Sequence, residues 1–569
     1  MNREKNELEQ LRHSSAHLLA QAINELYPGT LFTIGPATEQ GFFYDFLPPT
    51  NLSESDLPAI EARMHELAAQ NIPITHRLIS KEEARTLFRD NPFKLELIDQ
   101  IEGEKVGIAE QGSFVDLCRG GHVASTGDIK HFILLGLSGS YWRGKKENAQ
   151  LQRITGTAFL TAQEFEDFKK HREDALKYDH RKLGKELDLF SLHPEGPGFP
   201  FFHPKGMLVV NELKGFMRSL LEKYGYREVS TPTILNEELW KRSGHYNHYR
   251  EIMYFLSIDD KGYAVKPMSC PGAFLIYKNR PRSYRELPMR LSEFGHVHRH
   301  ELSGVLHGLM RVRAFTQDDA HIFCTLSQAE AEIKRVLEMI FITMEKMGFK
   351  DLKIVLATRP ENAMGSEEQW KLATEALRKA LDASGRPYSI NEGEGAFYGP
   401  KIEIHFEDSM GRSWQCGTIQ VDLVQPENFD LSFVTPSGTK ERVIVIHHAI
   451  YGSLERFLAV LLEHYKGHLP FWLAPIQVRV LPITEKEVHY AEEIAQKLRS
   501  ALLRVEVDTS SDALSGKIKE AQLDRIPWML VIGAKEAAAQ TVTLRKSDGS
   551  QEFGLTIDTL LERAKALSK

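Results

Sequence analysis

The stretch RLSEFGHVHRHELSGVLHGLMRVRAFTQDDAHIF, residues 290–323, predicts the structure of the middle of this chain. Both of its ends are apolar and strand-like, and Ser303-Gly304 stands between them as a turn signal. Two strands joined by such a turn form a hairpin, so we expect a long pair of antiparallel strands here.

Arginines are concentrated in this predicted hairpin. They stand at positions 290, 299, 311 and 313, with Glu293 and Glu301 among them. A guanidinium held by a carboxylate offers two parallel donors, which suits a phosphate better than a lysine does. The pattern fits either a phosphate site or a solvated, charged hairpin. Because no Gly-rich nucleotide loop is suitably placed, any ATP would be bound through arginines, including Arg456 in HHAIYGSLERF.

Short strands and helices surround the hairpin. KIEIHF (401–406) and RVIVIHH (442–448) predict strands, and NELKGFMRSLLEKYGY (211–226) predicts a helix. Residues 161–187 are expected to form one charged helix that bridges two domains. From about residue 475 onward strand and helix patterns alternate, which predicts a mostly parallel α/β sheet.

The first region of the chain mixes helix and strand patterns. LRHSSAHLLAQAINELY (11–27) predicts an amphipathic helix that ends at Pro28-Gly29. His13 and His17 are four residues apart in this helix, so their side chains share one face.

Cys118 and His122 are likewise four residues apart, in the Gly-rich sequence CRGGH. With the two helix histidines they could form a tetrahedral zinc site. They could equally form a metal-free hydrolytic site, in which histidines position water and the thiol or Asp116 assists. The third interpretation is two surface histidines and an unrelated buried cysteine. Spacing alone does not place the two pairs in one site.

Cys270, His321 and His447 are also possible metal ligands, but 51 and 126 residues separate them. Metal sites that can be identified from sequence have ligands a few residues apart. From the pattern alone, each of the three is more readily explained as a core or surface residue.

Composition restricts the class of protein. A chain of 569 residues corresponds to about four domains, and four cysteines are too few for a disulfide scaffold. Lys and Arg total 71 against 78 for Asp and Glu, a net charge of −7, so we expect no DNA partner. No apolar run approaches the ~18 residues of a membrane span. The charged start MNREKNELEQ lacks a secretory signal. We therefore expect a cytoplasmic protein with no membrane partner.

Several motifs together resemble those of the threonyl-tRNA synthetase family of class II aminoacyl-tRNA synthetases. KPMSCPG, LHGLMRVRAFTQDDAHIF, GAFYGPKIEI, WQCGTIQ and YGSLERF stand in the family's order. The resemblance covers nearly the whole chain, and implies a form that lacks the small ubiquitin-like domain with which the family often begins. The implied domains are an α+β editing domain (1–155), a helical linker (156–189), a class II catalytic domain with an antiparallel sheet (190–472) and an α/β anticodon-binding domain (473–569).

The resemblance implies ATP-dependent ligation of threonine to tRNA(Thr) through a threonyl-adenylate. GYREVSTPTI (225–234) resembles the first class II motif, which implies a homodimer. Magnesium would accompany the ATP. The implied ATP-binding residues are Arg299, Glu301, Arg311 and Arg456. The implied threonine-binding residues are Gln317, Asp319, Tyr398, Gln415 and Gln420. The implied catalytic residues are Arg299, Lys401, Tyr398 and His245, the last of which would assist attack by the terminal ribose hydroxyl of tRNA.

One zinc ion per subunit is implied at Cys270, His321 and His447. Its purpose would be discrimination, because an apolar pocket rejects an isostere such as valine poorly. A zinc ion with open positions can take the amino group and hydroxyl of threonine, and valine has no hydroxyl.

Serine keeps that hydroxyl and lacks only a methyl group, which is worth about 1–3 kcal/mol of selectivity. A second site must therefore hydrolyse seryl-tRNA. The implied editing residues are His13, His17, Cys118, His122, Asp116 and Lys94, and the family precedent is a site without metal. In the last domain, Arg545 and Glu536 match positions that read the anticodon.

The sequence departs from the family at several positions. Gly121 replaces a usual proline, Ala273 a frequent histidine and His448 a usual arginine. DTSSDALSGKI (508–518) lacks charged residues that the family tends to place there. Two other functions compete with the synthetase: a non-catalytic tRNA-binding paralogue and a stand-alone deacylase of mischarged tRNA. Such a paralogue tends to lose the ATP arginines or the metal ligands, and this chain keeps Arg299, Arg311, Arg456 and all three ligand residues.

Overall fold

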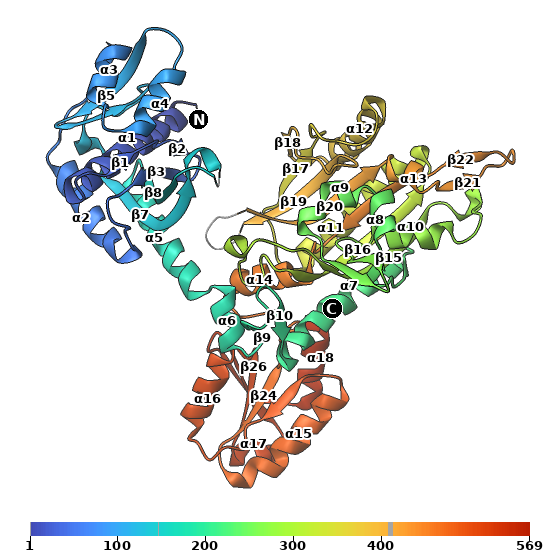
Figure 1. Ribbon diagram of the computed structural model, residues 1–569. Coiled ribbons are helices and arrows are strands. Elements are labelled where there is room, and N and C mark those ends of the chain that lie inside the picture. Colours follow the sequence, from blue (N-terminus) through green and yellow to red (C-terminus); the bar gives the residue numbers. More distant parts are fainter. Residues whose placement is uncertain (1, 146, 408–412, 569) are drawn as a thin grey trace. The chain divides into compact units, whose positions relative to one another are not determined.

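The computed structural model describes residues 2–145, 147–407 and 413–568. It contains two compact units, Met1–Glu173 and Asp174–Lys569; Figure 1 shows the first in blue and teal and the second from green to red. None of the helices in the described ranges is both long and apolar enough to cross a membrane.

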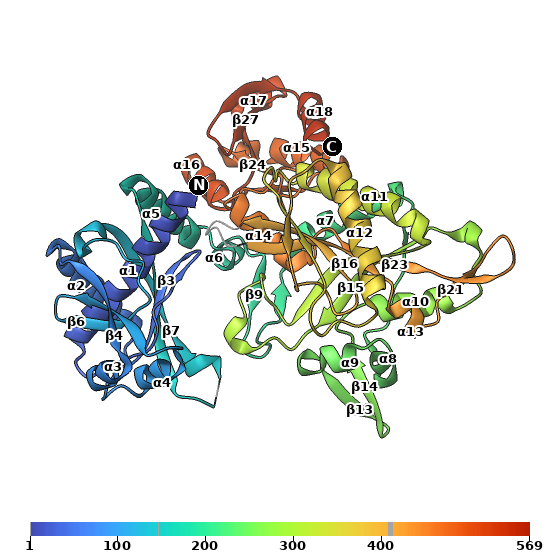
Figure 2. The ribbon, with the colours of Figure 1, turned by 90° about the horizontal axis from the view of Figure 1, so that it is seen from above.

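Unit 1 packs a long helix against an antiparallel sheet. The helix is α1 (Asn2–Leu26), and the sheet has the order β1-β3-β8-β7, with β2 beside β3. The strands are β1 (Leu31–Phe32), β2 (Ala37–Thr38), β3 (Gly41–Leu47), β7 (His131–Tyr141) and β8 (Gln150–Phe159). Figure 2 shows α1 alongside β3, and apolar residues of α1 such as Leu19 and Ile23 share a core with Phe42 of that strand. The predicted helix and its end before Pro28-Gly29 are confirmed.

A second, smaller sheet completes unit 1. Its order is β4-β5-β6, and its strands are β4 (Ile74–Ser80), β5 (Lys105–Gln111) and β6 (Phe114–Leu117). The accompanying helices are α2 (Leu57–Ala69), α3 (Lys81–Leu87) and α4 (Pro92–Gln100). Cys118 follows β6 directly, so the chain leaves this sheet at the predicted Gly-rich loop.

The segment that leads from unit 1 to unit 2 is not the single helix that the sequence predicts. It forms α5 (Ala162–Lys177) and α6 (His180–Glu186). The prediction was wrong because Asp179 adopts a non-helical conformation and caps α6, its carboxylate accepting from the backbone N–H of Arg181 at 2.8 Å. The sheet of unit 1 also runs further than expected, since His131 of β7 pairs with Phe159 of β8.

Unit 2 is built around an eight-stranded sheet of order β11-β15-β16-β23-β20-β19-β17-β18. Only its two outer pairs, β11 with β15 and β17 with β18, are parallel. The strands are β11 (Arg227–Glu228), β15 (Met289–His298), β16 (Ala314–Cys324), β17 (Lys353–Ala357), β18 (Ser389–Asn391), β19 (Lys401–Glu407), β20 (Ser413–Asp422) and β23 (Ile444–Ala449). The antiparallel sheet expected for a class II core is thereby confirmed.

The long helices that share a hydrophobic core with this sheet are α7 (Pro204–Lys223), α11 (Leu326–Lys346), α12 (Glu367–Ser384) and α14 (Leu454–His464), and Leu183 of α6 packs into the same core. Strands β15 and β16 form the predicted hairpin, with Glu293 opposite Asp319 and Leu291 opposite His321. Residues 299–313 connect the two strands, and Ser303 starts a short 3₁₀ turn within this connection.

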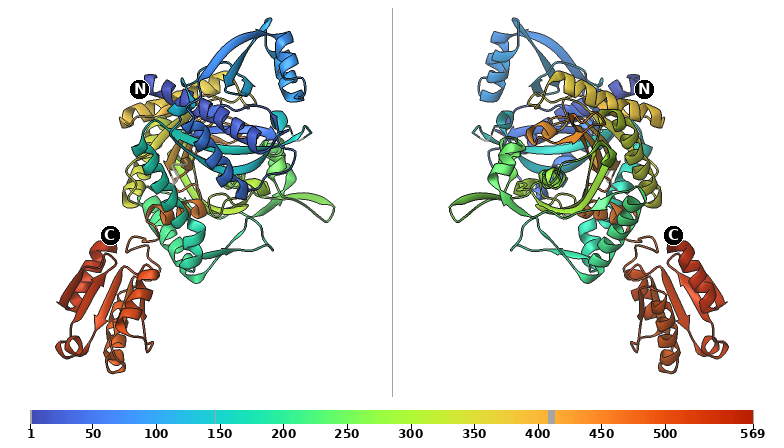
Figure 3. Two further views of the ribbon diagram at one scale, coloured as in Figure 1. Left: turned by 90° about the vertical axis from the view of Figure 1, so that its left-hand side faces the viewer. Right: turned by 90° about the vertical axis from the view of Figure 1, so that its right-hand side faces the viewer.

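The last part of the chain forms a five-stranded sheet of order β25-β24-β26-β27-β28 with helices on both faces (Figures 1 and 3). The strands are β24 (Val478–Pro482), β25 (Val505–Val507), β26 (Trp528–Ile532), β27 (Val542–Lys546) and β28 (Gln551–Leu555), and the helices are α15 (Val488–Ser500), α16 (Leu514–Leu523), α17 (Ala534–Ala539) and α18 (Ile557–Ser568). The first three strands are parallel, but β27 and β28 are antiparallel. The predicted βαβαβ arrangement is confirmed, since β24, β25 and β26 are parallel with α15 and α16 between them in the sequence. The last two strands depart from a mostly parallel sheet, and the short turn at Asp548-Gly549 joins β27 to β28 as a hairpin.

Two candidate active sites

Cys270, His321 and His447 meet in unit 2 although they are far apart in the sequence. Cys270 begins α10 (Cys270–Lys278), while His321 and His447 lie opposite each other on the neighbouring strands β16 and β23. One ligand atom of each residue lies within 4.8 Å of those of the other two. The three side chains are buried, with exposed fractions of 1%, 2% and 4%. Strand pairing therefore makes one cluster of three residues that the sequence could not connect.

One cysteine and two histidines are of the residue types that bind metal ions, and their surroundings fit that role. Nε2 of His321 and Nδ1 of His447 are buried and have no hydrogen-bond partner among the described residues, which is costly unless something else binds them. The other ring nitrogen of His447, Nε2, lies 3.1 Å from a carboxylate oxygen of Asp422. Histidines that bind metals commonly donate their second N–H in this way. Burial raises the pKa of the Cys270 thiol, so its thiolate needs a cation nearby.

A cavity of about 440 Å³ adjoins the cluster, with Cys270 and His447 in its wall. This volume is within the range of small-molecule sites. The cavity is also lined by all the predicted ATP- and threonine-binding residues and by Lys401: Arg299, Glu301, Arg311, Gln317, Asp319, Tyr398, Lys401, Gln415, Gln420 and Arg456. One concave site thus holds Cys270, His447 and the arginines together.

The arginines in the cavity wall are oriented by main-chain carbonyls and by a carboxylate. Arg456 donates from Nε to the carbonyl of Met310 at 3.0 Å and from Nη1 to the carbonyl of Gln415 at 2.7 Å. Arg311 donates to Glu301 at 3.1 Å. Each guanidinium has five N–H groups, so both arginines retain donors for a phosphate after these contacts.

Several polar side chains lie beside Cys270 and His447. Burial, with the neighbouring charge of Glu293, raises the pKa of Asp319 to about 8. The hydroxyl of Tyr398 donates to Gln420, which lies opposite His447 on the adjoining strand. Lys401 pairs with Glu403 at 2.6 Å. These groups can accept from or donate to an amino group, a hydroxyl and a carboxylate.

His245 does not line this cavity. Its Nδ1 lies 2.8 Å from Ser243 Oγ and its Nε2 lies 3.0 Å from Met268 Sδ. Met268 does line the cavity, and so does His248, which the sequence analysis missed three residues further along. Burial lowers the pKa of His245 to about 3, so its imidazole is neutral.

Asp422 is a second residue beside this site that the sequence analysis missed. It is buried, and its second oxygen accepts from the backbone N–H groups of Val424 and Gln425, both at 2.9 Å. Asp422 follows Gln420 by two residues in β20, and side chains two apart in a strand point to the same face. That spacing was the available signal.

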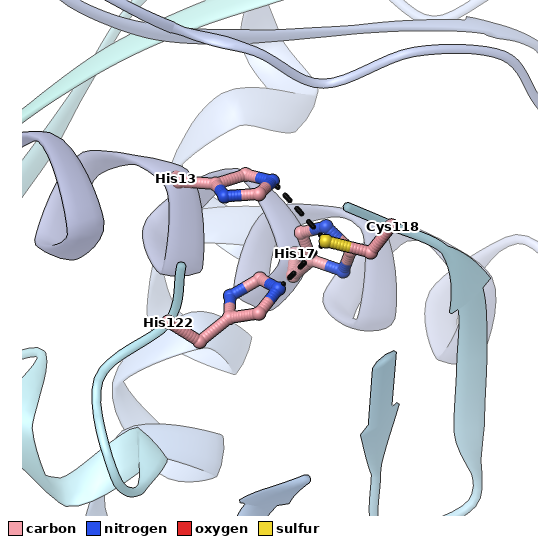
Figure 4. Close-up of side chains that lie close together, drawn as sticks. All are labelled: His13, His17, Cys118 and His122. Atoms are coloured by element: carbon pink, nitrogen blue, oxygen red, sulfur yellow. Dashed lines mark hydrogen bonds between the residues drawn. The ribbon is translucent and has the colours of Figure 1, made fainter. Parts of the chain in front are cut away.

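The second candidate site lies in unit 1, where His13, His17, Cys118 and His122 come together (Figure 4). Two residues come from α1 and two from the loop after β6. Cys118 Sγ lies 2.9 Å from His122 Nε2 and 3.6 Å from His13 Nε2. The rings of His13 and His122 stack with their centroids 4.4 Å apart. The four side chains therefore make one cluster, as either of the two functional interpretations of the sequence requires.

A cavity of about 960 Å³ adjoins this cluster, and Lys94 and Asp116 line it together with His13, His17 and Cys118. Asp116 is buried, pairs with Lys94 and accepts from the hydroxyl of Tyr44. Its carboxylate lies 4.0 Å from Nδ1 of His17. Tyr44, on β3, was not predicted; its position within an apolar run, GFFYDFL, gave no signal of a polar contact.

Burial sets the protonation of the unit 1 cluster. It lowers the pKa of His13 and His17, and lowers that of His122 to about 3. Burial also raises the pKa of Cys118 to about 11. Near neutral pH the imidazoles are therefore neutral, whereas the thiol keeps its proton and can donate a hydrogen bond to a neighbouring imidazole.

Gly121, which replaces the family's proline, has a backbone φ of +83°. Proline is fixed near −65° and cannot adopt this conformation. Gly120 has a φ of +95°, so both glycines of CRGGH lie in the left-handed region. The loop that carries His122 consequently follows a backbone path that proline at position 121 would exclude.

Arg545 and Glu536 lie on β27 and α17 of the last sheet. Both oxygens of Glu536 are engaged, one with the backbone N–H of Gly533 at 3.0 Å and one with Thr543 Oγ1 at 2.9 Å. Arg545 Nε is buried without a hydrogen-bond partner in the described part of the chain. Glu536 thus caps a helix, and Arg545 has donors available for another group.

Three family models match the chain. They are the tRNA synthetase class II core domain (G, H, P, S and T) at residues 254–465, the anticodon binding domain at 477–567, and the threonyl and alanyl tRNA synthetase second additional domain at 106–155. Each match falls on a part of the chain whose fold and side chains are described above.

Curated relatives and solved structures agree with these matches. A threonine–tRNA ligase of Caldanaerobacter subterraneus is 51% identical over 97% of this chain and 86% of its own. One from Thermotoga maritima is 52% identical over 95% and 85%. The crystal structure of the RNA binding domain of threonyl-tRNA synthetase from Cryptosporidium parvum is 44% identical, with a TM-score of 0.66 over 68% of this chain and 98% of that one. Such identity over most of both sequences shows that the chain belongs to the threonyl-tRNA synthetase family of class II aminoacyl-tRNA synthetases.

Proposed function

We propose that this protein activates L-threonine with ATP and Mg²⁺, transfers it to tRNA(Thr) and hydrolyses seryl-tRNA made in error. The observation that carries the proposal is the single cavity in which Arg299, Arg311 and Arg456 lie with Cys270 and His447. Residues 190–472 would catalyse ligation, 1–155 would edit and 473–569 would bind the anticodon, with 156–189 as a linker.

ATP would be bound by the arginines of the cavity wall. Arg456 and Arg311 are already oriented by Met310 and Glu301, so little side-chain entropy is lost when a triphosphate binds. Arg299 lies over the ring of Phe315 at 5.2 Å, which holds its guanidinium in place. Attack by the threonine carboxylate on the α-phosphate would form the adenylate and release pyrophosphate, with the arginines compensating the negative charge.

Threonine would be selected by its hydroxyl. A zinc ion held by Cys270, His321 and His447, one per subunit, would supply a Lewis acid for the amino group and the hydroxyl. Asp319 would accept a hydrogen bond from that hydroxyl, and Gln317, Tyr398, Gln415, Gln420 and Lys401 would enclose the amino acid. Valine leaves this acceptor of Asp319 without a donor, and a buried polar group without a partner costs free energy.

His245 receives a positioning role in this proposal. Because it contacts Met268 and does not line the cavity, we assign it the placement of that wall rather than contact with the ribose hydroxyl.

Editing would use the cluster in unit 1. Neutral imidazoles of His13, His17 and His122 can accept a proton from water as its oxygen attacks the ester carbonyl of seryl-tRNA. The ester C–O bond breaks, serine leaves as the free acid and the ribose oxygen takes up a proton. Asp116, held by Lys94 and Tyr44, would orient His17. We propose that this reaction needs no metal; two zinc ions per purified chain would refute that part.

A cytoplasmic homodimer is the form that we propose. GYREVSTPTI contains β11, a two-residue strand at the edge of the eight-stranded sheet, and an edge strand can pair or pack with a second copy. Arg545 is proposed to contact the anticodon because it lies in the part of the chain that matches the anticodon binding domain. Glu536 would act there only by supporting the turn that it caps.

ATP–pyrophosphate exchange with threonine, serine and valine tests the proposal. We expect exchange with threonine, weaker exchange with serine and almost none with valine. No exchange with any of the three on folded, zinc-loaded protein would favour the tRNA-binding paralogue. Serine release from seryl-tRNA by such inactive protein would favour the stand-alone deacylase.

A further inference from the structure

His180 is a completely buried histidine that neither proposed site uses. It stands at the first position of α6, seven residues after Glu173, the last residue of unit 1. Its Nδ1 lies 2.8 Å from Oε1 of Glu463 on α14, and its Nε2 lies 3.0 Å from the backbone nitrogen of Leu309. One imidazole therefore connects the linker to two elements of the catalytic domain.

The hydrogen bonds of His180 define its tautomer. The Leu309 backbone N–H can only donate, so Nε2 must accept and carries no proton. The proton is then on Nδ1 and is donated to Glu463. Gly308 confirms how closely the loop approaches, because a Cβ built on it would lie 2.1 Å from His180 Nε2.

Leu309 lies in the same turn as residues that contact or carry the proposed ATP-binding arginines. Residues 307–311 form a tight turn, in which Arg311 N donates to His307 O at 3.2 Å. The carbonyl of Met310, the residue after Leu309, accepts from Arg456 Nε at 3.0 Å. Arg456 lies on α14, the same helix that carries Glu463. His180 thus fixes the position of the turn relative to the helix, and the turn and the helix together orient Arg456 and place Arg311.

A second set of ring contacts runs in parallel. The ring of His307 lies 5.7 Å from that of His180 and stacks on Trp414 at 6.1 Å. The Arg456 guanidinium lies 5.6 Å from the ring of Trp414. The hydrogen bonds and the ring contacts therefore both connect His180 to Arg456.

We propose that His180 is a positioning residue for ATP: its neutral imidazole holds the 307–311 turn against α14, so that Arg311 and Arg456 are preorganised for the triphosphate. The proposal rests on the proposed function for the identity of the nucleotide. Asp179 and His307 also lie near His180 with the spacing of a metal cluster. Because both nitrogens of His180 already make hydrogen bonds, we assign it to the turn and not to a metal.

The test compares His180→Phe with His180→Gln in the full-length protein. Phenylalanine keeps the ring but has no nitrogen, whereas the glutamine amide offers one acceptor and one donor, as the imidazole does. We expect His180→Phe to raise both the KM for ATP in threonine-dependent exchange and the Kd for ATP by about tenfold, the scale of one buried hydrogen bond. The KM for threonine should stay within about twofold, and His180→Gln should recover most of the ATP affinity.

Tyr465→Phe is the matched control. It removes a hydrogen bond of 2.9 Å from Tyr465 to the carbonyl of Met347, just after α14 and away from the 307–311 turn. This variant should lose thermal stability without a change in ATP affinity. If a folded His180→Phe binds ATP normally, if the KM for threonine rises as much as that for ATP, or if glutamine is no better than phenylalanine, the proposal is wrong.

Two further outcomes need separate treatment: a His180→Phe variant that does not fold, and a failure of the proposed function itself. If His180→Phe does not fold, Gly308→Ala replaces it, because its methyl group would displace His180; an equal rise in both KM values would then refute the proposal. If the unmodified protein binds ATP but shows no threonine-dependent exchange, the proposed function fails, and the Kd comparison still decides the role of His180.

Discussion

The carboxylate of Asp422 lies 3.1 Å from Nε2 of His447, and the backbone N–H groups of Val424 and Gln425 hold that carboxylate in place. An ionised carboxylate can only accept, so Nε2 of His447 carries the proton and Nδ1 presents its lone pair. Nδ1 is the nitrogen without a partner. Asp422 therefore selects the tautomer that can bind a metal.

Asp422→Asn should reverse this selection. The amide oxygen would accept from Val424 and Gln425, leaving the NH₂ group to face His447. The ring would then accept at Nε2 and carry its proton on Nδ1, which blocks the proposed ligand atom. We expect zinc affinity to fall by about 10- to 100-fold, measured by competition with a chromogenic chelator. Asp430→Asn, at an exposed ion pair with Arg442, is the control. Unchanged zinc affinity in Asp422→Asn would contradict the tautomer argument.

A substitution in one candidate site should abolish the activity of that site and leave the activity of the other unchanged. Cys270→Ser removes the thiolate donor and should abolish threonine activation, as measured by ATP–pyrophosphate exchange. His13→Ala should leave that exchange unchanged, because His13 lies in the other unit, and should accumulate seryl-tRNA in aminoacylation assays with serine. Normal threonine activation by Cys270→Ser would disprove the zinc assignment, and absence of seryl-tRNA with His13→Ala would disprove the editing assignment.

The sequence predicts those features of the fold whose signals lie within a few consecutive residues. The β15–β16 hairpin and α1 were predictable because their signals are local: a Ser-Gly turn and a Pro-Gly stop. The break before α6 was missed. Asp179 caps the N-terminus of α6 with its side chain, but it stands in a run of charged residues that favour a helix. The antiparallel β27–β28 pair was missed although Asp548-Gly549 is a turn signal.

The sites show the same limit. Cys270, His321 and His447 become a cluster only through the pairing of β16 with β23, which no spacing reveals. The resemblance to a family supplied that connection, whereas physical reasoning on the residues left it open. Tyr44 has no local signature of function, and Asp422 has only its spacing of two residues from Gln420, since the contacts of both depend on the residues that the fold brings beside them.

The pH dependence of editing follows from the burial of its histidines. An ordinary histidine gains a proton as the pH falls through 6.5, and would lose its capacity as a base. Burial lowers the pKa of His13, His17 and His122, the last to about 3, so each should keep its neutral form to a lower pH than an ordinary histidine does. Single-turnover hydrolysis of seryl-tRNA between pH 5 and 8 should therefore show no titration step near 6.5. A sigmoidal loss of rate centred there would contradict this assignment of the bases.

The backbone at Gly121 gives the last prediction. Its φ of +83° is closed to proline, so Gly121→Pro should force the loop onto another path and move His122 away from Cys118. Editing of seryl-tRNA should fall by at least about tenfold, while threonine activation is unaffected. Gly121→Ala is the matched variant: no atom lies within 4 Å of its added methyl group, so only the left-handed backbone penalty of about 1–2 kcal/mol remains. Its loss of editing should be smaller. If proline edits as well as glycine, the loop has a second path that also brings His122 to the cluster, and the position of His122 does not depend on the conformation of Gly121.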